Sequence, residues 1–118
     1  MNASKYYTYI IRCDDESLYT GITTDIKRRF EEHSSKSSKG AKYTKNHKPK
    51  RIEAVWESDS RALASKLEYR IKKLPKEKKQ LLIDSNNIEI LNEKINVEDY
   101  RRLALIDSYT AFYSNPNK

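Results

Sequence analysis

Apolar and polar residues alternate near the start of the chain in a way that predicts a β-hairpin. Residues 6–13 follow the two-residue period of a strand and are rich in β-favouring side chains, and residues 18–22 form a second such run. The polar residues 14–17 between the two runs predict a turn. This turn lacks glycine, so we expect a longer and looser connection between the strands.

A third short strand is predicted over residues 51–57, where apolar and charged positions alternate again. Successive side chains of a strand point to opposite faces of the sheet. The pattern therefore assigns one face to Ile52, Ala54 and Trp56, and the other face to Glu53, Val55 and Glu57.

Helical spacing of apolar residues predicts a first helix from near Asp25 to about Ser35, with Thr24 or Asp25 as its cap. A second helix is expected to begin near residues 58–60. Its apolar stripe, which marks the buried side of this helix, consists of Leu63, Ala64, Leu67, Ile71 and Leu74.

Pro75 ends the second helix and opens a third over residues 76–83, since a missing N–H is harmless in a first turn. Residues 85–95 carry mixed signals and predict a connector with a short ordered piece. Asn96 is the candidate cap of a last amphipathic helix, which we expect from Val97 to about Phe112.

This order of elements predicts a small α+β fold, in which helices flank a three-stranded, largely antiparallel sheet and an extra helix follows at the C-terminus. We expect one domain over residues 4–84 and a C-terminal extension over residues 85–118. The last helix is expected to dock on the domain, with docking on a second copy as the alternative. Monomer and homodimer both remain open.

Charge changes this picture, because 24 Lys and Arg residues against 17 Asp and Glu residues give a net charge of +7 over 118 residues. A surplus of this size favours polyanionic partners such as nucleic acid, although a basic protein without such a partner is the plainer alternative. The single Cys13 excludes an intramolecular disulfide and a cysteine-rich metal site, and it suits a reducing compartment. No apolar run spans a bilayer and no signal-like stretch begins the chain, so we expect a cytoplasmic protein without membrane contact.

Four residues of the first helix form the most informative pattern in the chain. Ile26, Arg29, Phe30 and His33 share one helix face, and two of them are apolar, so this face should point inward. A buried guanidinium without a partner costs several kcal/mol as an order of magnitude. Arg29 therefore indicates a bound anion, with a structural ion pair to Glu68 as the alternative.

Two tyrosines and a carboxylate are expected near the same face. Tyr9 and Tyr19 can be neighbours if the hairpin pairs as drawn, and Gly21 permits a close approach of the backbone. Glu68 borders the buried stripe of the second helix. This set of groups suits phosphodiester hydrolysis. The carboxylate can bind a hard cation, the guanidinium can bind the phosphate, and a phenol or an imidazole can take the proton of the attacking water.

At these residues the chain resembles the GIY-YIG nuclease domain, and in particular its small, single-domain, YhbQ-like bacterial subgroup. The resemblance covers about residues 4–83. Tyr7 stands where the first signature has glycine. The matching motifs, in order, are Tyr7-Thr8-Tyr9, Tyr19-Thr20-Gly21, Asp25, Arg28, Arg29, His33, Gly40-Ala41-Lys42-Tyr43-Thr44 with Pro49, and Glu68 to Leu74.

The resemblance implies a metal-dependent endonuclease and a role for each matching residue. Tyr9 corresponds to a general base or water-positioning tyrosine and ranks above His33, which corresponds to a position in the proton-handling network. Tyr19 would line the same pocket and Arg29 would stabilise charge on the phosphate. Glu68 would hold one divalent cation, Mg2+ or Mn2+, beside the leaving 3′ oxygen, so that the other fragment carries a 5′ phosphate. DNA repair and recombination are the settings that the family suggests.

Several side chains are candidate DNA contacts rather than catalysts. They are Arg28, Lys42, Tyr43, Lys72, Lys73 and Lys79. The alternative interpretation of these side chains is a basic face that only contacts solvent. For His33 the alternative is a core histidine whose hydrogen bonds are satisfied within the protein. For the whole protein the alternatives are a nucleic-acid-binding module with weak cleavage and, less favoured, a protein-interaction module that uses the last helix.

Overall fold

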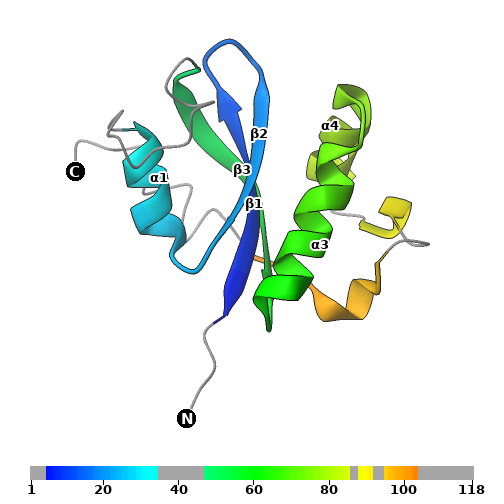
Figure 1. Cartoon of the computed structure of the whole chain (residues 1–118). Coiled ribbons are helices and arrows are strands. Elements are labelled where there is room, and N and C mark those ends of the chain that lie inside the picture. The colour runs from blue at the N-terminus through cyan, green and yellow to red at the C-terminus, as the bar shows by residue number, and fades with distance from the viewer. Residues whose placement is uncertain (1–4, 35–46, 86–87, 92–94, 104–118) are drawn as a thin grey trace.

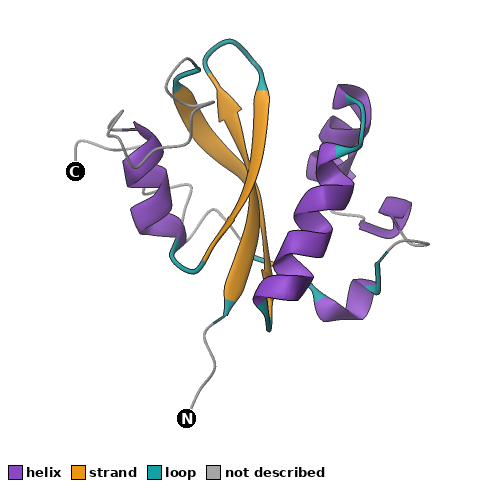
Figure 2. Cartoon of the chain, in the orientation of Figure 1, coloured by secondary structure: helices purple, strands orange, loops and turns teal. Residues whose placement is uncertain are grey.

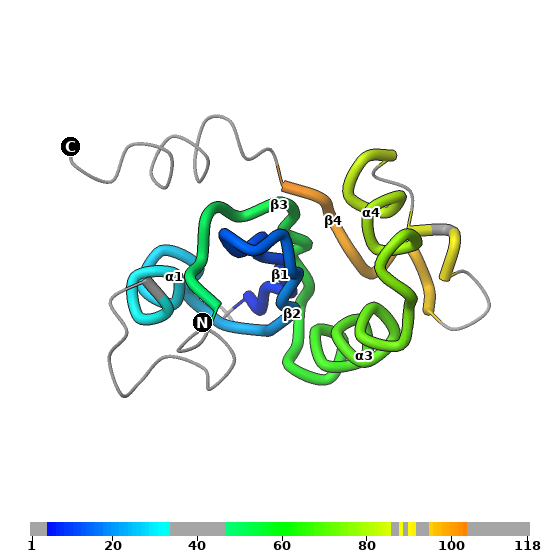
Figure 3. The backbone as a smooth tube through the Cα atoms, turned by 90° about the horizontal axis from the view of Figure 1, so that it is seen from above, coloured from blue at the N-terminus to red at the C-terminus, as the bar shows by residue number. Residues whose placement is uncertain are grey.

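The computed structural model describes residues 5–34, 47–85, 88–91 and 95–103. An antiparallel sheet stands at its centre, with one helix on one side and two on the other (Figure 1). The view from above shows the same three layers (Figure 3). The described strands, coloured orange in Figure 2, are β1 (Tyr6–Cys13), β2 (Leu18–Thr23), β3 (Pro49–Ser58) and β4 (Arg101–Arg102), in the order β2-β1-β3-β4. The predicted α+β fold is confirmed, but the sheet has a fourth strand.

The hairpin of β1 and β2 closes more tightly than its sequence predicts. The Cys13 N–H donates to the Ser17 carbonyl over 2.9 Å, and the Glu16 N–H donates to the Cys13 carbonyl over 2.9 Å. Glu16 takes a φ of 70°, the left-handed conformation that glycine usually provides. The connection is longer than a two-residue turn, as expected, but it is not loose, because Glu16 accepts the strained position.

A β-bulge in β3 changes which face its side chains reach. Ile10 pairs with Ala54 and Ile11 pairs with Ile52, which leaves Glu53 as the extra residue. A bulge shifts the alternation by one position. Ile52 therefore packs on the same face as Val55, and the prediction that it shares a face with Ala54 was wrong.

One face of the sheet carries α1 (Ile26–Ser34). The Asp25 carboxylate caps this helix by accepting from the Arg28 N–H over 3.1 Å, as predicted. We call the apolar cluster between α1 and the sheet the α1-side core. Its buried members are Tyr9, Ile11, Cys13, Ile26, Phe30, Ile52 and Val55.

The opposite face carries α3 (Arg61–Lys72) and α4 (Lys76–Ser85), on either side of Pro75. The Ser60 hydroxyl caps α3 by accepting from the Leu63 N–H. We call the cluster beneath these helices the α3-side core; among its buried members are Ile10, Ala54, Trp56, Leu67, Ile71, Leu82 and Tyr100. No helix in the described ranges is long and apolar enough to cross a membrane.

The C-terminal part of the described chain is not the predicted long helix. After the short 3-10 helix η1 (Ile88–Leu91), Asn96 caps a single 3-10 turn, η2 (Val97–Asp99). The backbone is extended at Tyr100, and β4 then pairs Arg102 with Trp56 of β3. An unpaired edge on β3 would leave backbone donors and acceptors without partners, so sheet pairing outweighs the helical pattern. The rest of the predicted helix lies outside the described residues.

Candidate active site

Three aromatic side chains meet in the α1-side core. Tyr9 of β1 is 2 % exposed and His33 of α1 is fully buried. The Tyr9 hydroxyl oxygen lies 3.0 Å from His33 Nε2, which is hydrogen-bonding distance. The Tyr19 ring lies 5.3 Å from the His33 ring and 6.3 Å from the Tyr9 ring, centre to centre. The structure therefore brings together the three residues that the sequence placed at one site.

Gly21 makes room for this group. In the hairpin register Tyr9 stands opposite Gly21. A Cβ at this position would lie 2.5 Å from the Tyr9 hydroxyl oxygen and 3.1 Å from the Tyr19 ring. The predicted close approach at Gly21 is confirmed, and what it requires is space, because Gly21 does not have a positive φ.

Arg29 lies on the rim of the same group, with its side chain 24 % exposed. Its guanidinium donates to Glu32 over 2.8 Å and also hydrogen-bonds Tyr9. Burial lowers the pKa of Arg29, but the bonds to Glu32 and Tyr9 outweigh that effect and raise it. Arg29 forms an ion pair with Glu32, whereas Glu68 was the partner that the sequence left open.

The pKa shifts leave both hydrogen-bonded groups neutral at neutral pH. Burial raises the pKa of Tyr9 well above its usual value, and the nearby Tyr19 adds to this, although Arg29 opposes it. Burial and the charge of Arg29 lower the pKa of His33 to about 4. A phenol and a neutral imidazole in contact can pass a proton between them, whereas a free phenolate is disfavoured here.

Glu68 stands on α3, which packs on the opposite face of the sheet from α1. Its side chain is 24 % exposed, and a carboxylate oxygen lies 3.3 Å from the Lys72 ammonium one helical turn away. It is also near enough for its charge to contribute to the raised pKa of Tyr9. Among the described residues no three His, Cys, Asp or Glu side chains group as a metal site.

This donor set fits a loosely held hard cation. Mg2+ keeps several water ligands and is commonly bound by one or two carboxylates together with substrate phosphate oxygens. The single, partly exposed carboxylate of Glu68 matches that description. Glu68 could therefore hold such a cation only if it gave up Lys72.

The candidate DNA contacts are divided between exposed and undescribed positions. Lys72 is exposed at the end of α3, Lys73 is exposed at the position that follows it, and Arg28 is exposed on α1. Burial lowers the pKa of Lys79 on α4, and the charge of Lys72 lowers it further. Lys42 and Tyr43 lie outside the described residues.

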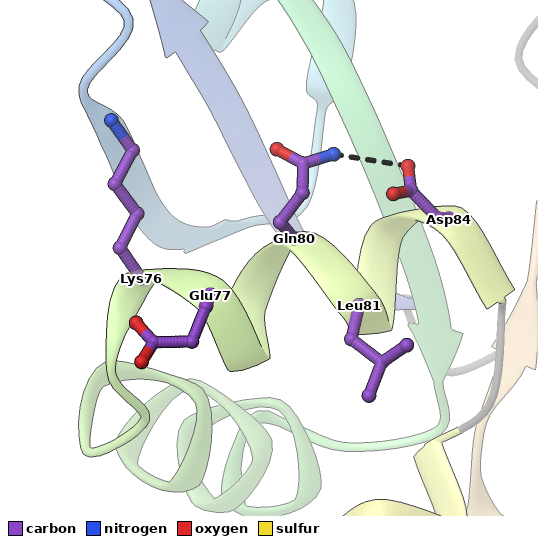
Figure 4. A pocket seen from close by; sticks show the side chains of 5 residues that line it. All are labelled: Lys76, Glu77, Gln80, Leu81 and Asp84. Carbon is purple, nitrogen blue, oxygen red and sulfur yellow. Dashed lines mark hydrogen bonds between the residues drawn. The ribbon is translucent and has the colours of Figure 1, made fainter.

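Sequence reasoning missed Glu32 as the carboxylate that holds Arg29. The i,i+3 spacing of the two residues was an available signal, because side chains three apart on a helix are neighbours. A separate hollow of about 510 Å3 on α4 contains none of the site residues. Lys76, Glu77, Gln80, Leu81 and Asp84 line it, and Gln80 donates to Asp84 there (Figure 4).

The imidazole of His33 is expected to titrate near pH 4. In the unfolded chain the same imidazole has a pKa of 6.5 and binds its proton more readily. The contribution of neutral, buried His33 to folding stability is therefore fully present above pH 6.5 and is lost as the pH falls to about 4. Nitrogen-detected NMR of the imidazole rings measures the titration midpoint of His33. The variant His47→Asn assigns the signals of the two histidines. A midpoint at 6.5 would contradict the buried, Arg29-adjacent position of His33.

Comparison with known proteins shows the family of the chain. The family model described as the GIY-YIG catalytic domain matches residues 5–80. A UPF0213 protein of Fusobacterium nucleatum is 53% identical over 78 residues, which are 66% of this chain and 76% of that protein. A UPF0213 protein of Halalkalibacterium halodurans is 45% identical over 78 residues, which are 66% of this chain and 81% of that protein.

A solved relative is the solution NMR structure of a UPF0213 protein from Bacillus halodurans. It is 40% identical, covers 75% of this chain and 93% of its own, and has a TM-score of 0.46. The family match spans well over half of the chain and includes every described site residue. The chain therefore belongs to the GIY-YIG family, among relatives that are UPF0213 proteins.

Proposed function

We propose that this protein is a metal-dependent endonuclease that hydrolyses DNA phosphodiester bonds, acting on branched, flexible or single-stranded DNA. One observation carries the proposal: the buried Tyr9–His33 contact of 3.0 Å lies beside a partly exposed arginine. The GIY-YIG family is one of endonucleases, which supports the reaction class. A setting in DNA repair or recombination, the cytoplasmic location and a domain boundary at residue 84 stay predictions.

Arg29 is the proposed phosphate ligand. Its guanidinium is already paired with the Glu32 carboxylate, whose planar oxygens resemble those of a phosphate. A scissile phosphate would take a share of these N–H donors at the exposed side of Arg29. The donors would then stabilise the charge that builds on the phosphate oxygens as water attacks phosphorus and the bond to the 3′ oxygen breaks.

Tyr9 and His33 are the proposed proton path. The attacking water would give its proton to the Tyr9 oxygen while Tyr9 gives its own proton to His33 Nε2, so no phenolate has to form. Arg29 holds the pKa of His33 down in the free protein. Because the phosphate offsets the charge of Arg29, bound DNA would raise the basicity of His33. This assigns the proton to His33 and the water's orientation to Tyr9, with Tyr19 packed against both rings.

Glu68 is the residue that would hold Mg2+ or Mn2+, together with a phosphate oxygen of the substrate. When bound, the cation supplies Lewis-acid stabilisation of the leaving oxygen. Release of Lys72 from Glu68 would free its ammonium for the DNA backbone. The charge of Lys72 disfavours the charged form of Lys79, and a phosphate bound by both would offset that repulsion.

The small size of the site surface supports a structure-dependent substrate. Phosphate contacts from groups such as Lys73 and Arg28 fix the position of DNA but carry no sequence information. A domain of this size offers little surface for reading a long sequence, since a single small module buries roughly 600–1,000 Å2 on DNA. Flexibility or branching of the substrate is therefore the feature that such a site can select.

Cleavage of end-labelled single-stranded, duplex and branched DNA tests the proposal. We expect nicking with Mg2+ or Mn2+, none with EDTA, and faster cleavage of branched or single-stranded DNA than of intact duplex. Activity should co-elute with the protein on gel filtration. Binding without cleavage in every metal would reject the nuclease and leave the binding module, the alternative that the sequence kept open.

A further inference from the structure

Tyr69 is an exposed aromatic side chain that the proposed reaction does not use. It follows Glu68 on α3, and 52% of its surface is accessible, the highest value among the large hydrophobic residues described. It therefore contributes little to either core. Adjacent Cα atoms are about 3.8 Å apart, so the Tyr69 backbone lies directly beside that of the proposed cation ligand.

Two cations lie against the Tyr69 ring. The guanidinium carbon of Arg70 is 5.2 Å from the ring centre, and the Lys73 ammonium nitrogen is 5.0 Å from it. Both distances are within the range of cation–π attraction, which gives this exposed ring a preferred orientation. Arg70 Nε has no hydrogen-bond acceptor within the described part of the chain, although it is covered. A phosphate that drew the guanidinium off the ring would provide that acceptor.

The same helix thus presents two neighbouring rows with different chemistry. Glu68 and Lys72 form one row, in which the carboxylate lies 3.3 Å from the ammonium. Tyr69 and Lys73 form the next row, one turn apart in the same way. An aromatic face flanked by cations is the arrangement that binds single strands, because bases stack on the ring while phosphates meet the cations.

We propose that Tyr69 is a stacking platform for an unpaired base next to the phosphate that is cut, and so selects DNA with a single-stranded segment. This deepens and rests on the proposed function, because it places the strand by the site of Arg29 and Glu68. A paired base is already stacked on both faces within the duplex, and extruding it costs a few kcal/mol. An unpaired base offers its face without that cost.

Binding measured in EDTA tests the platform independently of cleavage. Fluorescence anisotropy would compare wild type, Tyr69→Ala and Tyr69→Trp on a labelled single strand, a flap and an intact duplex. Stacking on one aromatic residue corresponds to about a tenfold change in affinity. We expect Tyr69→Ala to weaken single-strand and flap binding by about that factor, duplex binding to change less than about twofold, and Tyr69→Trp to bind as wild type.

An abasic scan identifies the base. Removing the stacked base should weaken wild-type binding by the same factor, and should cost nothing further in Tyr69→Ala. Leu81→Ala, which removes another exposed apolar side chain, is the matched control and should leave all affinities unchanged. Equal weakening on all three DNAs, no weakening at all, or tighter binding of RNA of the same sequence would overturn the platform.

The two proposals fail in different ways. If Tyr69 governs single-strand affinity but wild type never cuts DNA with Mg2+ or Mn2+, the nuclease is rejected and Tyr69 is a stacking platform for single-strand binding alone. If wild type cuts and Tyr69→Ala binds every DNA as wild type does, the platform is rejected and the nuclease stands. Failure of wild type to bind any of the DNAs would reject both.

Discussion

Glu68→Gln is expected to lower metal-dependent DNA cleavage by a factor of about 10²–10³ while leaving the fold intact, as removal of one charge-stabilising group does in other active sites. Glutamine keeps the shape of the side chain but removes the charge that would hold a hard cation. The ion pair that is lost, with Lys72, is a partly exposed i,i+4 pair worth only about 0.3–0.5 kcal/mol. Cleavage rates and urea unfolding of the same samples measure both effects.

The control for this variant is Glu77→Gln, which neutralises an exposed carboxylate in the first turn of α4. It should cleave as wild type does. If Glu68 is a cation ligand, raising the metal concentration should recover part of the lost activity of Glu68→Gln but change the control little. A Glu68→Gln protein that cuts DNA at the wild-type rate at all metal concentrations would show that the site is elsewhere.

Gly21→Ala is expected to damage stability and cleavage together. Its Cβ would lie 2.5 Å from the Tyr9 hydroxyl oxygen, and Tyr9 is buried and bonded to His33, so the tyrosine has to move. Overpacking of this kind typically costs about 1–3 kcal/mol. Displacing a reacting group by about 1 Å can cost about 10²-fold in rate. Urea unfolding and the cleavage rate give the two values.

The sign of the stability change in Gly21→Ala shows whether the clash with Tyr9 outweighs the effect on the unfolded chain. Gly21 does not have a positive φ, so without the clash an alanine here would stabilise the protein by about 0.4–1 kcal/mol through the unfolded chain. In a Tyr9→Phe background the hydroxyl contact at 2.5 Å is gone but the ring carbon Cζ, 2.8 Å from the added Cβ, remains, so the cost of Gly21→Ala should become smaller without disappearing. An alanine that costs the same in both backgrounds would disprove that the Tyr9 hydroxyl is what requires the glycine.

Local patterns predicted the hairpin and the first two long helices well. The strand over residues 6–13 and the Asp25 cap are where the sequence placed them, because periodicity and capping depend on neighbouring residues. The shared face of α1 was predicted for the same reason, and Ile26, Phe30 and His33 are all buried.

The failures involve partners far away in the chain. The bulge at Glu53 depends on its pairing with β1, and Arg12, a buried arginine of that strand, donates to the Glu53 carboxylate. The strand at Arg101 and Arg102 exists because β3 offers an edge to pair with. Neither requirement is visible in the local pattern, and the amphipathic residues from Val97 onwards favoured a helix.

Prediction of the site divides in the same way. The residue types and their convergence could be read from the spacing of Arg29 and His33. Their protonation could not, because it depends on burial: the resemblance made Tyr9 a general base or a water-positioning residue, whereas burial raises the pKa of that phenol. The Glu32 partner of Arg29 shows a further limit, since either carboxylate was compatible with the sequence.

The two cores on opposite faces of the sheet have a consequence for local opening. The nine-residue α1 is held by the smaller α1-side core, whereas α3 and α4 share theirs with the segment that ends at Tyr100. Segments that bury less apolar surface open at lower free energy. Arg29 and His33 therefore belong to the part of the described protein that should exchange its amide hydrogens first. Binding of a phosphate to Arg29 would stabilise the folded, packed state of α1 by mass action. Substrate would therefore help to order the site that cleaves it.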